Sequence, residues 1–226
     1  MSNTNNTLTR RELLTGRWSE PVKPADSGRF VGPASSTPGG VSTSERASRR
    51  LPDCVVRNHR EDTFRLVSDL ISDQRVILGF IYTRCKGICP TTTLHMREAY
   101  RVLTARQAAP FRMITISVDP ERDSPDDMLR HAAVNEAAGF PNWQFVVASP
   151  EDTLAIRRGL RLVDPDPVRD RNVSTHSGVL VLGNDRSNRW GGIPSGAAPV
   201  HIANTFERIA RVGTLQEFAG FGQQPS

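Results

Sequence analysis

The sequence predicts an α/β layer fold, and three observations support this expectation. Segments of strand length and helix length alternate from residue 75 to residue 160. The runs 75–82 and 111–118 are apolar on both faces, which is typical of strands buried inside a sheet. A predicted β-hairpin and a last helix follow this alternation. Together these features favour a mixed sheet covered by helices.

The expected elements begin after a polar N-terminal segment. Residues 54–56 and 63–66 have the composition of short strands around a turn at Asn58-His59. The apolar run 75–82 follows as the first fully buried strand. A helix is expected from Pro90 to about residue 105, so the first strand-to-helix connection lies between residues 82 and 90.

Capping residues define the elements of the second half. Ser124 precedes Pro125 and two acidic residues, so a helix is predicted to begin at Pro125. This helix is expected to run to about Ala138 and to stop at Gly139. The other predicted elements are the strand 111–118, a strand over 144–148, a helix over 150–160, a hairpin of strands 178–182 and 189–192 joined through 183–185, and a helix from His201 to about Val212.

Composition divides the chain at residue 50. Residues 1–50 are rich in Ser, Thr, Pro, Gly and Arg, and their eight Lys/Arg against four Asp/Glu account for +4 of the net charge of +5. We therefore predict a disordered basic arm over 1–50 and a folded domain over 51–226. The folded part is nearly neutral, at 21 basic against 20 acidic residues, so no nucleic-acid partner is expected.

The N-terminus carries half of an export signal. Arg10-Arg11 followed by Leu13-Leu14 resembles the start of a twin-arginine signal, which also needs an apolar stretch of about 7–15 residues. The chain becomes polar after Leu14, so the alternative interpretation is a basic arm. No apolar run reaches the roughly 18–20 residues that cross a bilayer, so no membrane span is expected.

The segment Cys85-Lys86-Gly87-Ile88-Cys89-Pro90 follows the first buried strand directly. Proline disfavours α geometry in the residue before it, so Cys89 is expected to be the N-cap of the helix. The positive end of the helix dipole favours a thiolate there. Two thiols in one loop exchange disulfides or share one soft metal ion. A structural disulfide is the alternative, although closing so short a loop stabilises little.

His176 stands two residues before the strand 178–182. If that strand and 75–82 are antiparallel neighbours, the imidazole and the two thiols meet at one edge of the sheet. Thiolates suit copper(I) and imidazole suits copper(II) and zinc. Zinc normally recruits a fourth ligand, so a three-ligand set favours copper that is both taken up and released.

Three segments in this order resemble the Sco/SenC family over about residues 51–212. They are residues 80–90, which contain Cys-x-x-x-Cys-Pro, residues 117–125, and Thr175-His176-Ser177. The resemblance implies a thioredoxin-like three-layer fold with a central mixed β-sheet flanked by helices. It also implies one copper ion per chain, Cu(I) or Cu(II), bound by Cys85, Cys89 and His176. Asp119 is a candidate supporting residue; its alternative role is turn and capping chemistry for the next helix.

The resemblance implies a periplasmic protein that delivers copper to the CuA centre of cytochrome oxidase, or reduces the cysteines of that centre. The leading hypothesis is thus a monomeric metallochaperone, whose partner is a copper-acceptor protein such as an oxidase subunit. The alternative is a thiol–disulfide oxidoreductase in which Cys85 attacks a target disulfide and Cys89 resolves the mixed disulfide. A third hypothesis is a copper or redox sensor that recruits a partner through its basic arm.

Overall fold

A computed structural model describes residues 47–170, 172 and 178–211 of the chain. The strands in this part are β1 (Val55–Asn58), β2 (Thr63–Arg65), β3 (Arg75–Ile81), β4 (Arg112–Ser117), β5 (Trp143–Val147), β6 (Val179–Asn184) and β7 (Arg189–Pro194). The helices are α2 (Ile88–Ala105), α3 (Pro125–Val134), α4 (Pro150–Gly159), α5 (Pro167–Asp170) and α6 (Pro199–Ala210), with a 3-10 turn η1 (Ala47–Arg50) and a π-helical turn η2 (Leu66–Ile71).

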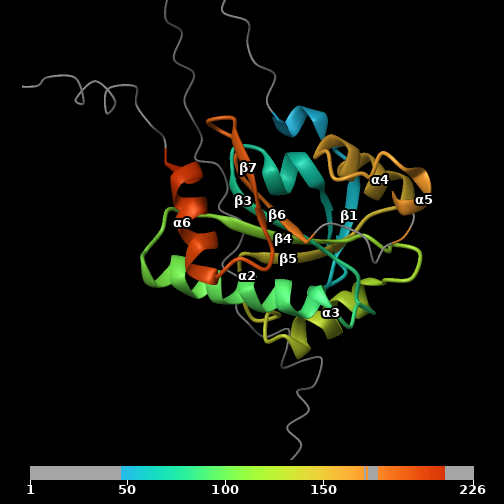
Figure 1. Ribbon diagram of the computed structural model, residues 1–226, viewed down its shortest axis with the longest axis horizontal. Helices are drawn as coiled ribbons and strands as arrows, with labels where there is room; N and C mark the ends of the chain where they lie inside the picture. The colour runs from blue at the N-terminus through green and yellow to red at the C-terminus, as the bar shows by residue number, and fades with distance from the viewer. Residues whose placement is uncertain (1–46, 171, 173–177, 212–226) are drawn as a thin grey trace, which may run out of the picture. The chain divides into compact units, whose positions relative to one another are not determined.

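The described strands form one mixed sheet in the order β2-β1-β5-β4-β3-β6-β7 (Figure 1). The three central strands β5, β4 and β3 are parallel, and antiparallel strands extend the sheet on both sides. The predicted antiparallel pairing of β3 with β6 is confirmed, with Ile77 opposite Leu182. The expected α/β class with a central mixed sheet between helices is therefore confirmed.

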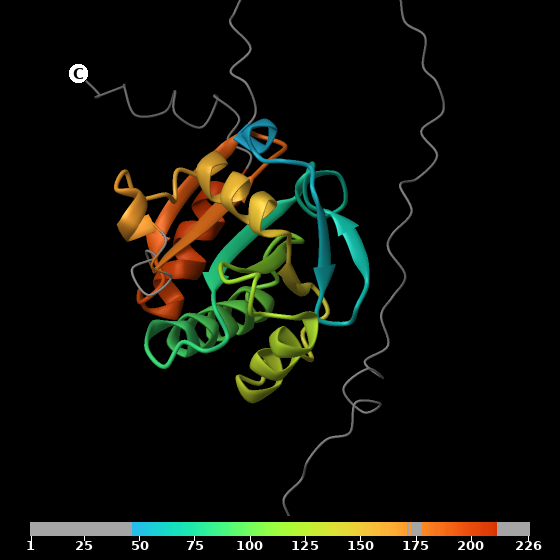
Figure 2. The same cartoon turned by 90° about the vertical axis from the view of Figure 1, so that its right-hand side faces the viewer.

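Helices cover both faces of the sheet. On one face, side chains of α2, α3 and α6 such as Met96, Met128 and Phe206 pack against Ile77 of β3 and Phe145 of β5. Figure 2 shows α2 and α3 on the opposite side of the sheet from α4. The sequence predicts this burial because the central strands are apolar on both faces, and β3 is buried at five of its seven positions.

The second face is covered by η2 and α4. Leu70 of η2 and Ile156 of α4 pack against Leu78 and Ile114 of the sheet. The turn η2 was not predicted from the sequence, because its six residues are too few to show a helical period.

The close approach of α2 to the sheet requires a glycine. A Cβ atom at Gly79 of β3 would lie 2.6 Å from Sδ of Met96, which is fully buried. Helix α2 therefore packs directly against β3, the strand that precedes it. This packing determines the path of the connection between them.

Helix α3 begins as predicted and ends earlier than predicted. Ser124 Oγ accepts from the N–H of Asp127 (3.2 Å), and the Asp127 carboxylate accepts from the N–H of Ser124 (2.9 Å), which is a capping box. The helix stops at Val134 and not at Ala138. Glu136 has a left-handed φ of 53°, and Ala137 N–H donates back to the carbonyl of Ala132, which is a Schellman C-cap.

The β6–β7 hairpin is longer than predicted. Gly183 and Asn184 were expected in the turn, yet both lie in β6, and the connection runs over residues 185–188. Asn184 stays in the strand because it is buried and its side-chain amide donates to the carbonyl of Ala210 at the end of α6. Asn188 supplies the left-handed φ of 52° in the turn.

The start of the folded domain is described from residue 47. The turn η1 lies within the segment 1–50 that was predicted to be disordered, and Ser48 in it is buried. A Cβ atom at Gly159 of α4 would lie 2.4 Å from the carbonyl oxygen of Arg50, so η1 packs closely against α4. Residues 1–46 lie outside the described part, and the basic arm stays a prediction.

Candidate metal and thiol site

The two cysteines lie at the carboxyl end of β3, where the chain turns into α2. In open α/β sheets this edge is where ligands generally bind. Residues 82–87 form the connection, which we call the cysteine loop, and the N–H of Cys85 donates to the carbonyl of Tyr82 (3.2 Å). Cys85 is half-buried and Cys89 is 4% exposed. Both are free thiols in this structure.

The N-cap of α2 differs from the prediction. The helix begins at Ile88, and Gly87 is its N-cap without any side-chain cap, so Cys89 lies in the first turn. Pro90 is tolerated in the third helical position because the first four N–H groups of a helix have no partner within the helix. The rule for residues before proline is a preference only, and the packing of α2 on β3 overrides it.

The two thiols have opposite tendencies to ionise. Burial opposes ionisation of Cys85, but hydrogen bonds to its sulfur outweigh it and lower its pKa. They come from the backbone N–H and thiol of Cys89, the hydroxyl of Tyr82 and the N–H of Gly87. Burial raises the pKa of Cys89 to about 12, assisted by the neighbouring Cys85. Cys85 is therefore the nucleophilic sulfur of the pair, and the thiol of Cys89 donates a hydrogen bond to it.

Tyr82 contacts both cysteines and was not singled out from the sequence. Its hydroxyl donates to Cys85, which raises the pKa of Tyr82 to about 12, and its backbone N–H donates to the sulfur of Cys89. No pattern in the sequence indicates this contact, because Tyr82 follows the apolar run of β3 and looks like its last core residue.

Asp123, which directly precedes the N-cap of α3, is a buried partner of the cysteine loop. The side chain is 4% exposed. Oδ1 accepts from the hydroxyl of Thr83 (2.6 Å), and Oδ2 accepts from the Thr83 N–H (3.1 Å) and from the hydroxyl of Ser117 (2.6 Å). The sequence shows only that a second aspartate follows Asp119 by four residues. This spacing does not indicate that the side chain is buried.

Asp119, the candidate supporting residue, begins the turn between β4 and α3. Its N–H donates to Ser117 Oγ (3.1 Å), and its carbonyl accepts from the N–H groups of Arg122 and Asp123. Its carboxylate lies 4.0 Å from the Arg122 guanidinium, and its charge helps to raise the pKa of Tyr82. The geometry is that of a turn residue near the site, and a supporting role stays a prediction.

His176 lies outside the described residues, so its predicted place beside the thiols stays a prediction. Gly178, two residues later, is described and lies against the start of α2. A Cβ atom there would be 2.5 Å from Cδ1 of Ile88 and 2.8 Å from Oγ of Ser195. Within residues 47–170, 172 and 178–211, no three His, Cys, Asp or Glu side chains are grouped as metal ligands.

The remaining sulfur atoms and imidazoles near the site are parts of the fold. Met96 is fully buried in the core. Cys54 is half-buried, and burial raises its pKa to about 11. His131 is buried, and its Nε2 lies 2.8 Å from the hydroxyl of Thr93, which donates to the carbonyl of Cys89. Met96 and His131 lie in the core around α2, whereas Cys54 packs against the core on the other face of the sheet.

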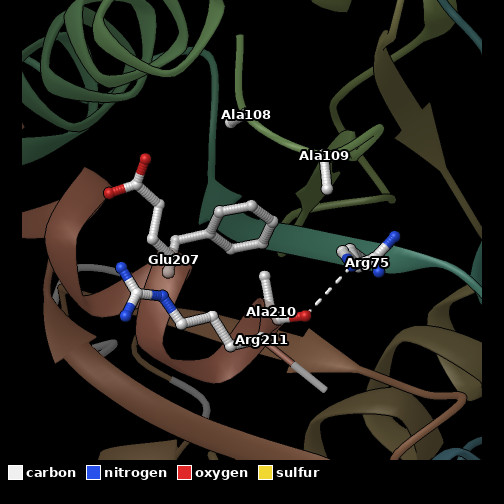
Figure 3. Close-up of a pocket in the computed structure, with 7 residues that line it drawn as sticks. Arg75, Ala108, Ala109, Glu207, Ala210 and Arg211 are labelled. Atoms are coloured by element: carbon white, nitrogen blue, oxygen red, sulfur yellow. Dashed lines mark hydrogen bonds between the residues drawn. The ribbon is translucent and has the colours of Figure 1, made fainter. Parts of the chain in front are cut away.

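A separate hollow of about 370 Å³ lies at the end of α6, and it contains no cysteine. Its lining includes Arg75, Phe206, Glu207 and Ala210 (Figure 3). Nε of Arg75 donates to the carbonyl of Ala210 (3.1 Å), and Glu207 pairs with Arg106 (3.0 Å). The protein itself satisfies these polar groups, so nothing in this hollow indicates a ligand.

The fold and the thiol pair define the class of protein: a thioredoxin-like protein with Cys-x-x-x-Cys where the first long helix begins. The SCO1/SenC family model matches residues 61–211, so the chain belongs to the SCO1/SenC family. A SCO1 protein homolog of Bacillus subtilis (strain 168) is 31% identical over 111 residues, which cover 48% of this chain and 56% of that protein. The chain spans about half the length of the curated relatives it matches.

Solved structures share the fold. A SCO1/SenC family lipoprotein from Bacillus anthracis str. Ames is 19% identical, with a TM-score of 0.58 over 71% of this chain and 95% of that chain. Yeast Sco1 with copper bound is 14% identical, with a TM-score of 0.57 over 76% of this chain and 93% of that chain. In the part of the chain that is described, no helix has the length and hydropathy of a membrane span.

Proposed function

We propose that this protein is a copper-binding metallochaperone. Cys85, Cys89 and His176 hold one copper ion, and the protein passes it to an acceptor protein. The observation that carries the proposal is the pair of hydrogen-bonded thiols at the carboxyl end of β3, one with a lowered pKa and one with a raised pKa. Thiolates are soft ligands that suit copper(I).

The short sequence distance between His176 and Gly178 supports His176 as a copper ligand. Gly178 lies against Ile88, and Ile88 is the neighbour of Cys89. His176 stands two residues before Gly178 in the sequence, and two residues span at most about 7 Å. We therefore propose its imidazole as the third ligand, which would complete a set of two sulfurs and one nitrogen.

The unequal pKa values of the two thiols suit uptake and release. Copper binding displaces the proton of Cys89, so affinity depends on pH. Cys85, which is half-exposed, is the ligand that an incoming thiolate of the acceptor reaches first. Copper(I) then moves by stepwise exchange of thiolate ligands, and Cys89 regains its proton as the ion leaves.

We further propose that the acceptor is a copper-site protein such as a cytochrome oxidase subunit, and that the protein acts as a monomer in the periplasm. Family membership supports an acceptor of this class. The Bacillus anthracis relative is a lipoprotein, which supports a location outside the cytoplasm.

Titration of the reduced protein with Cu(I), against a chromophoric chelator, tests copper binding. We expect one tightly bound equivalent, loss of tight binding in Cys85→Ser and Cys89→Ser, and weakened binding in His176→Ala. His201→Ala is the matched control, because His201 is exposed on α6. Binding in His176→Ala equal to that of the wild type would remove this histidine from the site.

A second function, thiol–disulfide exchange, is favoured by the lowered pKa of Cys85. The Cys85 thiolate attacks one sulfur of a target disulfide, which forms a mixed disulfide and releases the first target thiolate. The Cys89 sulfur then loses its proton and attacks Cys85, which releases the second target thiol. The target is reduced by two electrons, and the protein ends as a Cys85–Cys89 disulfide.

His176→Ala separates the two functions. Thiol exchange does not require the imidazole, so reduction of a small disulfide such as glutathione disulfide should proceed in this variant while copper binding is weakened. If the variant loses both activities together, the histidine acts on the thiols themselves, and exchange without copper is not an independent function.

A further inference from the structure

We infer that Asp123 is the positioning residue of the cysteine loop: its buried carboxylate holds the loop in the geometry that the copper-binding thiols require. The inference rests on the proposed copper function. Within the described residues, Asp123 forms no hydrogen bond with either cysteine sulfur. It acts on the cysteine loop through Thr83.

Asp123 joins three segments that are far apart in the sequence. Thr83, in the cysteine loop, donates its hydroxyl to Oδ1 (2.6 Å) and its N–H to Oδ2 (3.1 Å). Ser117, at the end of β4, donates its hydroxyl to Oδ2 (2.6 Å). Asp123 itself precedes the N-cap Ser124 of α3. One carboxylate therefore ties the cysteine loop to a strand and to a helix start.

A carboxylate suits this position better than any neutral side chain. All three partners present donors, and an ionised carboxylate is purely an acceptor. Hydrogen bonds to a charged acceptor are about twice as strong as neutral ones. Asp123 is 4% exposed, so water does not compete for these bonds. An asparagine of the same shape places an NH2 group against at least one donor.

The hydrogen bonds between Asp123 and Thr83 lie close in sequence to the nucleophilic sulfur of Cys85. Thr83 is two residues before Cys85, and the next residue, Arg84, donates to the carbonyl of Arg122 (3.1 Å). Tyr82, which precedes Thr83, donates to both sulfurs. A shift of Thr83 therefore moves the donors and the Cys85 backbone together. Asp123 thus fixes the spacing of the two sulfurs.

The test compares Asp123→Asn and Thr83→Val with Thr115→Val as the matched control. Thr115 is a buried residue of β4 whose hydroxyl accepts from the indole N–H of Trp143 (2.9 Å), so this variant loses a buried hydrogen bond of the same sheet away from the loop. Thr83→Ser, which keeps the hydroxyl, is the rescue variant. Each folded protein is measured for Cu(I) affinity, for the thiolate-to-copper absorption band of the Cu(II) form, and for unfolding in urea.

We expect Asp123→Asn and Thr83→Val to weaken copper binding by about 10-fold, the lower end of the range for losing a direct hydrogen-bond partner of a metal ligand, because both residues act one step further away. The absorption band should shift in both variants. Thr83→Ser should restore the wild-type affinity and band. Thr115→Val should lower stability while leaving affinity and band unchanged. Thr83→Val is the milder variant, since it leaves the carboxylate in place. It tests the contact between Thr83 and Asp123 if Asp123→Asn does not fold.

A site-resolved measurement on the copper-free protein separates this inference from the proposed function. The rate at which iodoacetamide modifies Cys85, followed by mass spectrometry, should change in Thr83→Val and not in Thr115→Val. If the wild type binds no copper, the proposed function is wrong, and a changed rate still supports the role of Asp123. If Thr83→Val matches Thr115→Val in rate, affinity and absorption, Asp123 is a structural residue only and the inference is overturned.

Discussion

Thr83 donates both its backbone N–H and its hydroxyl to the carboxylate of Asp123, across forty residues of sequence. The contact joins the segment after β3 to the segment after β4, which are neighbouring parallel strands. The thiol chemistry therefore depends on two adjacent connections at one edge of the sheet, and not on the Cys-x-x-x-Cys segment alone.

Tyr82→Phe should raise the pKa of Cys85. The variant removes the hydroxyl that donates to the Cys85 sulfur, so the thiolate loses one of its stabilising hydrogen bonds. The rate of Cys85 alkylation as a function of pH measures this pKa. The midpoint should lie below the ordinary thiol value in the wild type and should move to higher pH in the variant.

Tyr100→Phe is the control for Tyr82→Phe, because Tyr100 is a buried tyrosine of α2 whose hydroxyl interacts with Thr104. An unchanged midpoint in Tyr82→Phe would show that the tyrosine hydroxyl does not stabilise the thiolate. Cys89 should stay unmodified over the same range, since its pKa is about 12.

Gly178→Ala should weaken copper binding through the start of β6. The new Cβ would lie 2.5 Å from Cδ1 of Ile88 and 2.8 Å from Oγ of Ser195, so these two side chains or the strand start must shift. His176 stands two residues before Gly178 in the sequence, so a shift of the strand start should lower the copper affinity, and we expect a fall of about tenfold. Cu(I) competition titration gives the measurement.

Two variants control for effects of Gly178→Ala on the fold. Gly192→Ala places a Cβ at an ordinary contact distance, 3.4 Å from Cγ1 of Val179, and should leave affinity unchanged. Adding Ile88→Ala to Gly178→Ala removes the closest clash and should restore part of the affinity. Wild-type binding in Gly178→Ala would show that the position of this strand start does not matter for copper.

Gly159→Ala should destabilise the domain. Its Cβ would lie 2.4 Å from the carbonyl oxygen of Arg50, and a backbone atom cannot swing away as a side chain does. The expected loss is about 1–3 kcal/mol in the free energy of unfolding, measured in urea. Gly139→Ala is the matched control, because no atom lies within 4 Å of the Cβ position there. Equal stability of the two variants would mean that η1 does not pack on α4 in solution.

Acid should destabilise the domain through His59. Burial lowers the pKa of this imidazole to about 4, against about 6.5 in the unfolded chain, so between these values the unfolded state binds the extra proton. Stability present above pH 6.5 is therefore lost as the pH falls to 4, by about 3 kcal/mol. Burial also lowers the pKa of His131, which adds a loss of the same sign.

Urea unfolding between pH 4 and pH 7 measures this dependence. His59→Leu should flatten the curve, since it removes the buried imidazole beside Phe145, whose ring centroid is 5.6 Å away. Neighbouring charges that also act on the imidazole are Arg60 and Asp62, and neither is changed in the variant. A curve of unchanged steepness in His59→Leu would assign the acid sensitivity to other groups.

Local patterns in the sequence determined the elements that carry the site. The doubly apolar run of β3, the Ser124 capping box and the spacing of Cys85 and Cys89 depend on residues close together in the chain, where side-chain periodicity and capping act. The strand β6 was also expected, and its antiparallel pairing with β3 was a hypothesis that the structure confirms. The α/β class and the family follow from these patterns.

Only the tertiary structure decided which polar groups become buried partners. No local sequence pattern indicates the roles of the Asp123 carboxylate and the Tyr82 hydroxyl. Their contacts with the cysteine loop depend on how β3, β4 and α2 pack. The same packing begins α2 at Ile88 and keeps Asn184 in β6. A local preference is worth about 1 kcal/mol or less, and the burial of a whole element outweighs it.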